Sequence, residues 1–398
     1  MIPPVLVVAM PHSVHSLRWL RTISGTDSRP VVLLPSMTER HLPELESLPL
    51  IADAEHLAHL RPGEVGLWVD RPEPGGPPDD LPIPIGFESR AALVRGATIA
   101  RVVRALRPAL LHSLEVQIAG YACLRAAEQL GPACPPWLVS SWGSDFYLYQ
   151  KLAAHQPILQ AVAGRMDGFL YECARDLDIV QALGFRRPVH RLIPATGGAD
   201  FARMPALSAL ARTSTRRRIL VKGYHGWSGR ALHTLSALHL AAPVLRAYRI
   251  SIALASAAVA DAARALAETD GIDIEVAPWD PKHDTALQRT AESRIAIGLG
   301  ISDGIGTTLL EAMALGAFPI AGTTSCAADW VRPGKEGLIV DPHDVPALAD
   351  AIRTAATDDA LMDAAAIRNR ETVERRWNIA DNRTAALAIY DALIRDRA

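Results

Sequence analysis

The chain has 398 residues, a length that predicts two domains, because single hydrophobic cores stop growing at about this size. Its 41 basic and 43 acidic side chains nearly cancel, and no long basic run occurs, which excludes the electrostatic footprint of a nucleic-acid binder. Hydrophobic residues make up 49% of the chain and aromatic residues only 5%, which is typical of a well-filled α/β protein and excludes large-scale disorder.

The cysteines and the N-terminus bear on the compartment. The four cysteines have neither Cys-x-x-Cys spacing nor the density of a secreted scaffold, so we expect a reducing, cytoplasmic setting and no metal site. The apolar run at residues 5–10 is too short for a membrane span and follows no basic leader, so it predicts a buried strand. A peripheral membrane contact stays open, although no basic amphipathic helix favours tight binding, and the oligomeric state stays unknown.

The first half alternates short apolar runs with helix-like segments, which predicts a parallel sheet covered by helices. The predicted strands span residues 5–10, 31–34, 65–69, 110–111, 137–140, 168–171 and 189–193. The predicted helices span residues 16–23, 90–106, 117–130, 158–163 and 174–183. The Pro- and Gly-rich run at 72–78 predicts a loop, because it can sustain neither element.

The second half repeats the alternation after a polar, Ala-rich stretch. Its predicted strands span residues 219–221, 249–254, 272–276, 295–298, 319–321 and 337–340. Its predicted helices span residues 231–241, 259–268, 283–292, 308–315, 327–331 and 345–355, and a helical tail follows at 359–394. We therefore predict an α/β fold with two Rossmann-like parallel-sheet domains that face a central cleft, the usual place for a ligand.

The segment from Ser302 to Gly316 is the most informative of the chain. It places Asp303 and Glu311 on either side of a Gly/Thr loop that opens into an apolar helix, where unpaired amides and the helix dipole favour anions. We interpret Glu311, in the first helical turn, as an acceptor for ribose hydroxyls, and Asp303 as a catalytic residue that accepts from sugar hydroxyls. The alternative is an ordinary acidic pair that the helix dipole favours. The loop residues expected to hold the phosphates and sugar are Gly304, Ile305, Gly306, Thr307 and Thr308.

Three segments in order, 302–316, 317–325 and 334–344, resemble the retaining glycosyltransferases of the GT-B fold, in particular family 4. The resemblance implies an acceptor-binding domain at 1–205, a nucleotide-sugar-binding domain at 206–375, and a C-terminal helix at 376–398 that crosses back to the first domain. It also implies sugar transfer from a nucleotide sugar to a hydroxyl acceptor, with retention, without metal and without a further cofactor. Asp303 stands where the family carries Glu.

The segment 222–230 of the chain matches the family's cationic phosphate-binding run, with departures. Tyr224 stands where the family has Arg, and Arg230 lies one place past the usual Lys. A departing nucleoside diphosphate gains negative charge and needs cations, so Lys222 and Arg230, together with Gly223, are the donor-site candidates. The alternative for Arg230 is a side chain that decorates a helix start, where a cation opposes the dipole unless an anion binds.

Two first-domain loops follow strands at the edge where ligand clefts form. His112 and Asp145 are candidates to position or deprotonate the acceptor hydroxyl, and the alternatives are a structural histidine and a helix cap. The resemblance places the loops that carry these residues at the donor sugar and the acceptor, with Trp142 in the place of a common His. The remaining acceptor-side candidates are His12, Trp142, Gly143 and Ser144.

Three further patterns bear on the base-binding, metal-binding and protease interpretations. Trp279 either flanks the nucleotide base or packs in the core. Asp176 and Asp178 match an Asp-x-Asp metal pattern, but residues two apart on a helix point away from each other. No Gly-x-Ser-x-Gly elbow supports a protease. The open alternatives to a transferase are a sugar-nucleotide epimerase or hydrolase of the same fold and a non-catalytic nucleotide-sugar-binding protein.

Overall fold

The computed structural model describes residues 2–25, 28–38, 42–69, 80–82, 84–85, 93–278 and 283–396. The chain forms two compact units, unit 1 of Met1–Gly198 with Ile379–Ala398 and unit 2 of Ala199–Asn378. The change of unit falls at residue 198 and not at 205, because Ala199 donates its N–H to the Trp377 carbonyl at 2.7 Å and pairs with Asn378. The helix that follows Asn378 then returns to unit 1.

Unit 1 is built on a parallel sheet of eight strands in the order β3-β4-β2-β1-β5-β6-β7-β8. The strands are β1 Val5–Ala9, β2 Val31–Pro35, β3 Leu50–Ile51, β4 Val65–Trp68, β5 Leu110–Leu114, β6 Trp137–Ser140, β7 Gly168–Tyr171 and β8 His190–Leu192. Strands β1, β5 and β6 are buried on both faces. The continuous apolar run of β1 predicts this, whereas β5 also buries His112 and Ser113.

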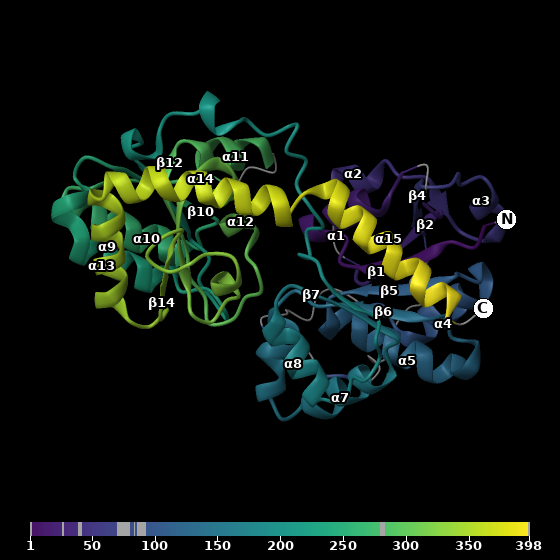
Figure 1. Cartoon of the computed structure of the whole chain (residues 1–398). Helices are drawn as coiled ribbons and strands as arrows, with labels where there is room; N and C mark the ends of the chain where they lie inside the picture. The colour runs from purple at the N-terminus through teal and green to yellow at the C-terminus, as the bar shows by residue number, and fades with distance from the viewer. Residues whose placement is uncertain are drawn as a thin grey trace. The chain divides into compact units, whose positions relative to one another are not determined.

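The helices of unit 1 cover both faces of this sheet (Figure 1). They are α1 Val14–Ile23, α2 Pro43–Glu46, α3 Ala54–Ala58, α4 Gly96–Leu106, α5 Tyr121–Leu130, α6 Ser144–Tyr147, α7 Gln156–Arg165, α8 Ala174–Ala182 and α15 Ile379–Arg395. The C-terminal α15 packs against α1, β5 and β8, and its Tyr390 is part of their apolar core.

Several elements of unit 1 differ from the prediction, and the short helices α2, α3 and α6 were not predicted. The two-residue strand β3 was not predicted, because it is too short to show a periodicity. Strand β5 runs on to Leu114, and the helix predicted from 117 begins as a π-helix over Val116–Gly120. The predicted loop 72–78 and the predicted helix start at 90 lie outside the described residues.

Unit 2 holds a second parallel sheet, of six strands in the order β11-β10-β9-β12-β13-β14. The strands are β9 Arg218–Lys222, β10 Arg249–Ala253, β11 Asp273–Val276, β12 Ser293–Gly298, β13 Phe318–Gly322 and β14 Leu338–Val340. The helices are α9 Ala231–Leu245, α10 Ala257–Asp270, α11 His283–Ala291, α12 Thr307–Leu315, α13 Val345–Thr357 and α14 Asp359–Arg376. The predicted helix 327–331 is one 3₁₀ turn, Ala327–Asp329. Both units thus have the predicted α/β architecture.

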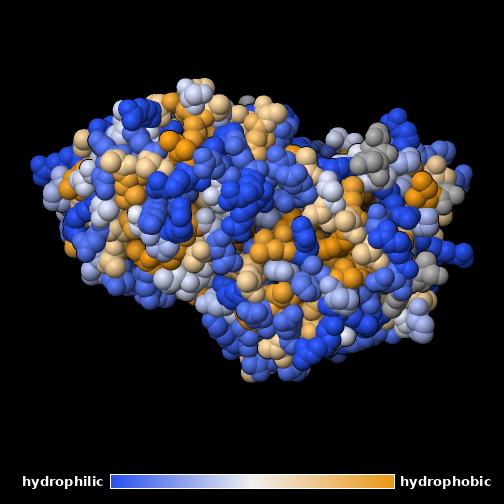
Figure 2. All heavy atoms as spheres, viewed as in Figure 1, coloured by the Kyte–Doolittle hydropathy of each residue, from blue (hydrophilic) through white to orange (hydrophobic). Residues whose placement is uncertain are grey.

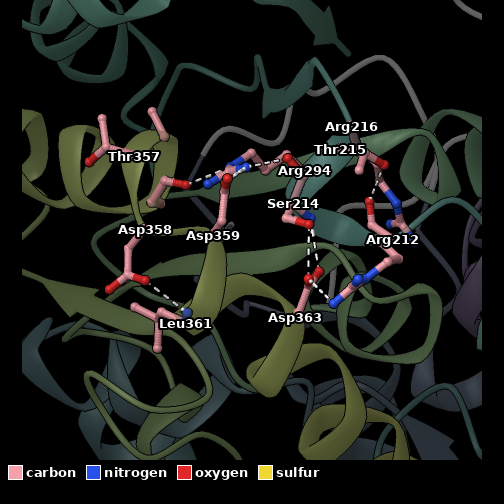
Figure 3. A network of polar contacts seen from close by, with 12 residues as sticks. Arg212, Ser214, Thr215, Arg216, Arg294, Thr357, Asp358, Asp359, Leu361 and Asp363 are labelled. Atoms are coloured by element: carbon pink, nitrogen blue, oxygen red, sulfur yellow. Dashed lines mark hydrogen bonds and ion pairs between the residues drawn. The ribbon is translucent and has the colours of Figure 1, made fainter.

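A buried polar network ties the chain before β9 to the corner between α13 and α14 (Figure 3). The fully buried Arg294 donates to the carbonyls of Ala355 at 2.8 Å and Ser214 at 2.7 Å, and its Nη1 lies 2.6 Å from Asp359 Oδ1. Asp363 accepts from the N–H and hydroxyl of Ser214. Arg294 is at the start of β12, so the network lies at the amino ends of the strands. It does not involve the carboxyl edge of the sheet.

The surface mixes hydrophilic and hydrophobic side chains, and the face in Figure 2 is largely blue with separate orange areas. Exposed large apolar side chains are spread along both units, and among them are Val14, Leu50, Tyr224, Leu240, Leu254 and Ile367. Among the described residues, no helix has both the length and the apolar character needed to cross a membrane.

Candidate functional site

A pocket opens in unit 2 at the carboxyl edge of the sheet, where β9, β12 and β13 end. Four of the predicted donor residues line it: Lys222, Asp303, Gly306 and Thr308. Tyr224, which replaces the family's Arg, also lines the pocket. Six predicted residues are not part of its lining: Gly223, Arg230, Gly304, Ile305, Thr307 and Glu311.

The loop that follows β12 is held by two neighbouring loops. Ile301 donates its N–H to the Ser228 carbonyl at 2.8 Å, and the Thr324 hydroxyl donates to the Gly300 carbonyl. The Cys326 N–H donates to the Gly304 carbonyl at 3.0 Å. These bonds fix the loop backbone before any ligand arrives, which lowers the entropy lost on binding.

Helix α12 starts at this loop and points its N-terminus at the pocket. Gly306 is the N-cap, and Leu309 is the first residue whose N–H bonds back to it, at 2.9 Å. The Thr307 hydroxyl is buried and has no hydrogen-bond partner within the part of the chain that the structure describes. The N-terminus of a nine-residue helix, where Gly306 and Thr308 line the pocket, suits an anion.

Lys222 and Asp303 face each other across the pocket. Lys222 is the last residue of β9, Asp303 follows the paired strand β12, and Lys222 Nζ lies 3.9 Å from Asp303 Oδ2. Both side chains are partly exposed, at 33% and 40%, so water screens the pair and it contributes little to stability. A weak pair of this kind can reorient toward a charged ligand.

Glu311 lies deeper than the sequence suggests. It was predicted in the first turn of its helix, but α12 begins at Thr307 and its first turn holds no acidic residue, so Glu311 stands in the second turn. Its side chain is 9% exposed, and Oε1 lies 2.7 Å from Nε2 of His283 at the start of α11. His283 was not singled out in the sequence, because a lone histidine beside a helix start carries no pattern.

Arg230 folds back on its own loop. Its Nη1 donates to the carbonyls of Gly229 at 2.8 Å and Gly226 at 3.2 Å, and its N–H donates to Leu299. The guanidinium therefore shapes the loop between β9 and α9 and, as described, does not reach the pocket. The loop carbonyls offset the unfavourable position of this cation at the start of a helix, because they accept hydrogen bonds from the guanidinium.

Two further donor candidates act through packing. Gly223 permits a close approach of two strand ends, since an added Cβ would lie 2.6 Å from Ile252 Cγ2, and its N–H donates to the Ala253 carbonyl at 2.6 Å. The Ile305 side chain is buried in an apolar cluster with Leu310, so it packs in the core and does not face a ligand. Trp279 lies outside the described residues.

In unit 1, His112 is a core residue. It has no exposed surface, Nδ1 lies 2.8 Å from Tyr390 Oη, and Nε2 lies 2.7 Å from Ser140 Oγ. Because Trp19 donates to Tyr390 at 3.1 Å, Tyr390 donates to His112, which fixes a neutral imidazole that donates to Ser140. Burial lowers the pKa of His112 to about 3. His112 therefore has the structural role that was the alternative for it, and the proposed catalytic residues do not include it.

Asp145 is buried beside a carboxylate that the sequence analysis had assigned no role, Glu115. Asp145 accepts from the N–H groups of Trp142 and, at 3.3 Å, of Val116, while Glu115 caps the π-helix by accepting from Ile118 and Ala119. Burial raises the pKa of Asp145 to about 6, and burial together with the charge of Asp145 raises the pKa of Glu115 to about 8.

Glu115 also has a left-handed backbone, with φ 72°, which is rare for a residue other than glycine. A strained backbone, a π-helix and two buried carboxyls occur together at the carboxyl ends of β5 and β6. Such features are frequent at functional sites. The signal available in the sequence was a charged residue directly after a buried strand.

The other acceptor-side candidates lie at the same edge of the unit 1 sheet. His12 is exposed in the turn between β1 and α1, and Ser144 begins α6. Trp142 is half-buried, with its ring 5.3 Å from that of His15. Gly143 has φ 88° and its carbonyl accepts from Arg175 at 3.1 Å, so this turn requires glycine. Asp145 accepts from the Trp142 N–H and so holds this turn, but it lies inside α6, whose N-cap is Gly143, and is therefore not the helix cap of the stated alternative.

The two parallel-sheet α/β units place the chain in the GT-B class of folds. Residues 263–372 match the profile of the family described as "Glycosyl transferases group 1", and this segment contains Asp303, Glu311 and His283.

Solved structures with this fold align over nearly the whole chain. Sucrose-phosphate synthase from Thermosynechococcus elongatus has a TM-score of 0.69 at 16% identity, with 99% of this chain and 100% of that chain covered. HepE from Anabaena in complex with UDP-glucose has a TM-score of 0.66 at 14% identity, with 98% and 99% covered. At these identities the likeness shows the fold.

A curated relative matches a shorter stretch. It is a GDP-mannose-dependent alpha-(1-6)-phosphatidylinositol monomannoside mannosyltransferase of Mycobacterium tuberculosis (strain CDC 1551 / Oshkosh), 36% identical over 75 residues. The match covers 19% of this chain and 20% of the relative, so the chain aligns with about a fifth of the length of the curated relatives it matches.

Proposed function

We propose that the protein is a glycosyltransferase that moves a sugar from a nucleotide-sugar donor to a hydroxyl group of an acceptor. The observation that carries the proposal is the fixed loop of residues 302–306, which leads into the N-terminus of α12 beside Lys222 at the pocket. A helix N-terminus and a cation together suit a diphosphate. The group 1 match and the UDP-glucose complex of HepE support it.

In this proposal unit 2 holds the donor. The amides of Gly306 to Thr308 and the ammonium of Lys222 bind the diphosphate, and Asp303 accepts from hydroxyls of the sugar. Glu311 accepts from the ribose hydroxyls. Arg230 and Gly223 shape the loop that presents Lys222.

The leaving diphosphate becomes more negative as its bond to the sugar breaks. Lys222 and the α12 N-terminus oppose that charge, and we propose that they do so without a metal ion. We further propose retention, in which the acceptor attacks the face that the diphosphate leaves and a phosphate oxygen helps to take its proton. Retention rests on the family resemblance.

Unit 1 binds the acceptor in this proposal. His12, Ser144 and the turn at Trp142 and Gly143 lie at the carboxyl edge of its sheet, and Asp145 positions that turn.

The test of the donor site is a thermal-shift panel of UDP, GDP, TDP, ADP and their sugar conjugates. A ligand that binds only the folded protein raises Tm. We expect one nucleotide series to raise Tm, a loss of that rise in Glu311→Gln, and an unchanged rise in Glu371→Gln, which removes an exposed carboxylate on α14. No shift with any nucleotide at millimolar concentration would overturn the proposed function.

The test of the reaction is release of the nucleoside diphosphate with and without a panel of hydroxyl acceptors. A transferase needs the acceptor. Release of free sugar without an acceptor would indicate a hydrolase, and binding without turnover would indicate a nucleotide-sugar-binding protein.

A further inference from the structure

The contact between His283 and Glu311 joins two helices at the edge of the donor site. His283 begins α11, Glu311 lies in α12, and the two helices pack against each other (Figure 1). His283 Nε2 and Glu311 Oε1 are 2.7 Å apart, the length of a charge-assisted hydrogen bond. A carboxylate only accepts at neutral pH, so Nε2 carries the proton and His283 donates.

The burial of the two side chains is unequal. The Glu311 side chain is 9% exposed, whereas that of His283 is 45% exposed. A nearly buried carboxylate needs donors to offset its lost hydration, and the cost of an unsatisfied one is larger than that of a neutral group. The hydrogen bond therefore stabilises the nearly buried Glu311 carboxylate more than it stabilises the half-exposed His283 ring.

The geometry also restricts Glu311. A glutamate has three side-chain torsions and loses rotamer freedom when it must bind at one place. One hydrogen bond to Oε1 fixes the carboxylate plane and uses one of its roughly four acceptor positions. A carboxylate held in this way can accept from two vicinal hydroxyls without first being ordered by the ligand.

We infer that His283 is a positioning residue of the donor site, which holds the Glu311 carboxylate in the orientation that accepts the ribose hydroxyls of the nucleotide. The inference rests on the proposed function and extends it, because no donor role was assigned to His283. The effect of His283 on nucleotide affinity should require both the Glu311 carboxylate and the ribose hydroxyls, and both requirements are measurable.

The experiment is calorimetric titration of UDP and GDP into the full chain. In His283→Ala we expect the nucleotide that binds the wild type to bind about tenfold more weakly, the effect of one charge-assisted hydrogen bond. His283→Gln keeps an N–H near the position of Nε2 and should restore binding to within about threefold. In the transfer assay the donor KM should rise and kcat should stay unchanged, since the bond positions the donor and takes no part in the chemistry.

Two controls separate this role from a merely structural one. His239 pairs with Asp270 at 2.8 Å with similar exposures, 56% and 10%, on other elements of unit 2, so His239→Ala should leave nucleotide affinity unchanged. The effect of His283→Ala should vanish in a Glu311→Gln background, as a double-mutant cycle requires, and with the matching 2′,3′-dideoxynucleoside diphosphate.

The outcomes are distinct. If the wild type binds no nucleotide, the proposed function fails. If the wild type binds and His283→Ala binds equally well or more tightly, or loses affinity equally in the Glu311→Gln background, the positioning role is overturned and the proposed function stands.

Discussion

Lys222 Nζ lies 3.9 Å from Asp303 Oδ2, and both side chains remain partly exposed at the pocket of unit 2. The pair spans the strand ends of β9 and β12, which are neighbours in the sheet. A partly solvated ion pair is worth little to folding, and its place at a pocket is suited to binding a charged ligand.

Lys222→Met should lower the rate of sugar transfer by about a hundredfold, because a cation that stabilises the leaving diphosphate is removed. The free energy of unfolding should change by less than about 1 kcal/mol, since the pair is partly exposed. Steady-state kinetics and urea unfolding measure the two effects. Lys335→Met removes an exposed lysine of the β13–β14 connection and should change neither.

Gly223 offers a second test of the same loop. In Gly223→Ala the new Cβ would lie 2.6 Å from Ile252 Cγ2 and 2.9 Å from the Ala253 carbonyl, so overpacking should destabilise unit 2 by about 1–3 kcal/mol. Gly226→Ala is the matched control in the same loop, because its nearest atom is Tyr224 Oη at 3.9 Å. Equal stabilities of the two variants in urea would contradict this account.

The Arg294–Asp359 pair predicts an asymmetric response. Arg294 is fully buried and Asp359 is 66% exposed. Arg294→Met removes the side-chain donor to the Ala355 carbonyl and leaves the Ser214 carbonyl with Arg217 as its donor, whereas Asp359→Asn leaves Arg294 bonded to both carbonyls. We expect about 2–4 kcal/mol of destabilisation for the first change and under about 1 kcal/mol for the second, from chemical denaturation. Similar losses would show that the ion pair, and not the buried carbonyl contacts, dominates.

The two sheets were predictable from the sequence because buried parallel strands are continuous apolar runs, and 137–140 and 168–171 match β6 and β7 residue for residue. The pocket residues Asp303, Gly306 and Thr308 came from one ordered motif, and Lys222 came from the separate segment 222–230. The motif orders residues along one segment, and so it could identify neither His283 nor the inward fold of Arg230, which depend on helix packing and on loop carbonyls.

His112 shows the opposite limit. A histidine at a strand end has the same sequence pattern whether it meets substrate or core, and what decides here is the contact with Tyr390, 278 positions away in the chain. Glu115 was not singled out for a related reason, since its burial depends on how the segments after β5 and β6, which carry Glu115 and Asp145, pack against each other. The burial of both residues depends on long-range packing, which the periodicity of the sequence does not encode.

His112→Gln should lower Tm yet keep sugar transfer at temperatures where the variant is folded, because the ring is buried and bonded on both nitrogens. A general base would lose about a hundredfold or more in kcat, and such a loss in the folded variant would restore a catalytic role. Burial places the folded pKa of His112 at about 3, below the unfolded value of 6.5, so its contribution to stability is lost as the pH falls below 6.5. At about pH 5 the loss is roughly 2 kcal/mol, and it should be absent in the variant.

Glu115→Gln should reverse its effect on stability with pH. Burial holds the folded pKa of Glu115 at about 8, above the unfolded value of 4.5, so its contribution is fully present below 4.5 and is lost as the pH rises through 8. A glutamine can still accept from Ile118 and Ala119 but carries no charge. Urea unfolding should therefore find the variant no more stable than the wild type at about pH 4.5 and more stable at about pH 9.

The control for this change is Glu128→Gln, which removes an exposed carboxylate on α5 paired with Arg125 at 2.9 Å. A surface pair is worth under about 1 kcal/mol, and its loss should be the same on both sides of pH 8. If Glu115→Gln also differs from the wild type by the same amount at both pH values, then Glu115 is ionised throughout, and the neighbouring Asp145 is the group that holds the proton.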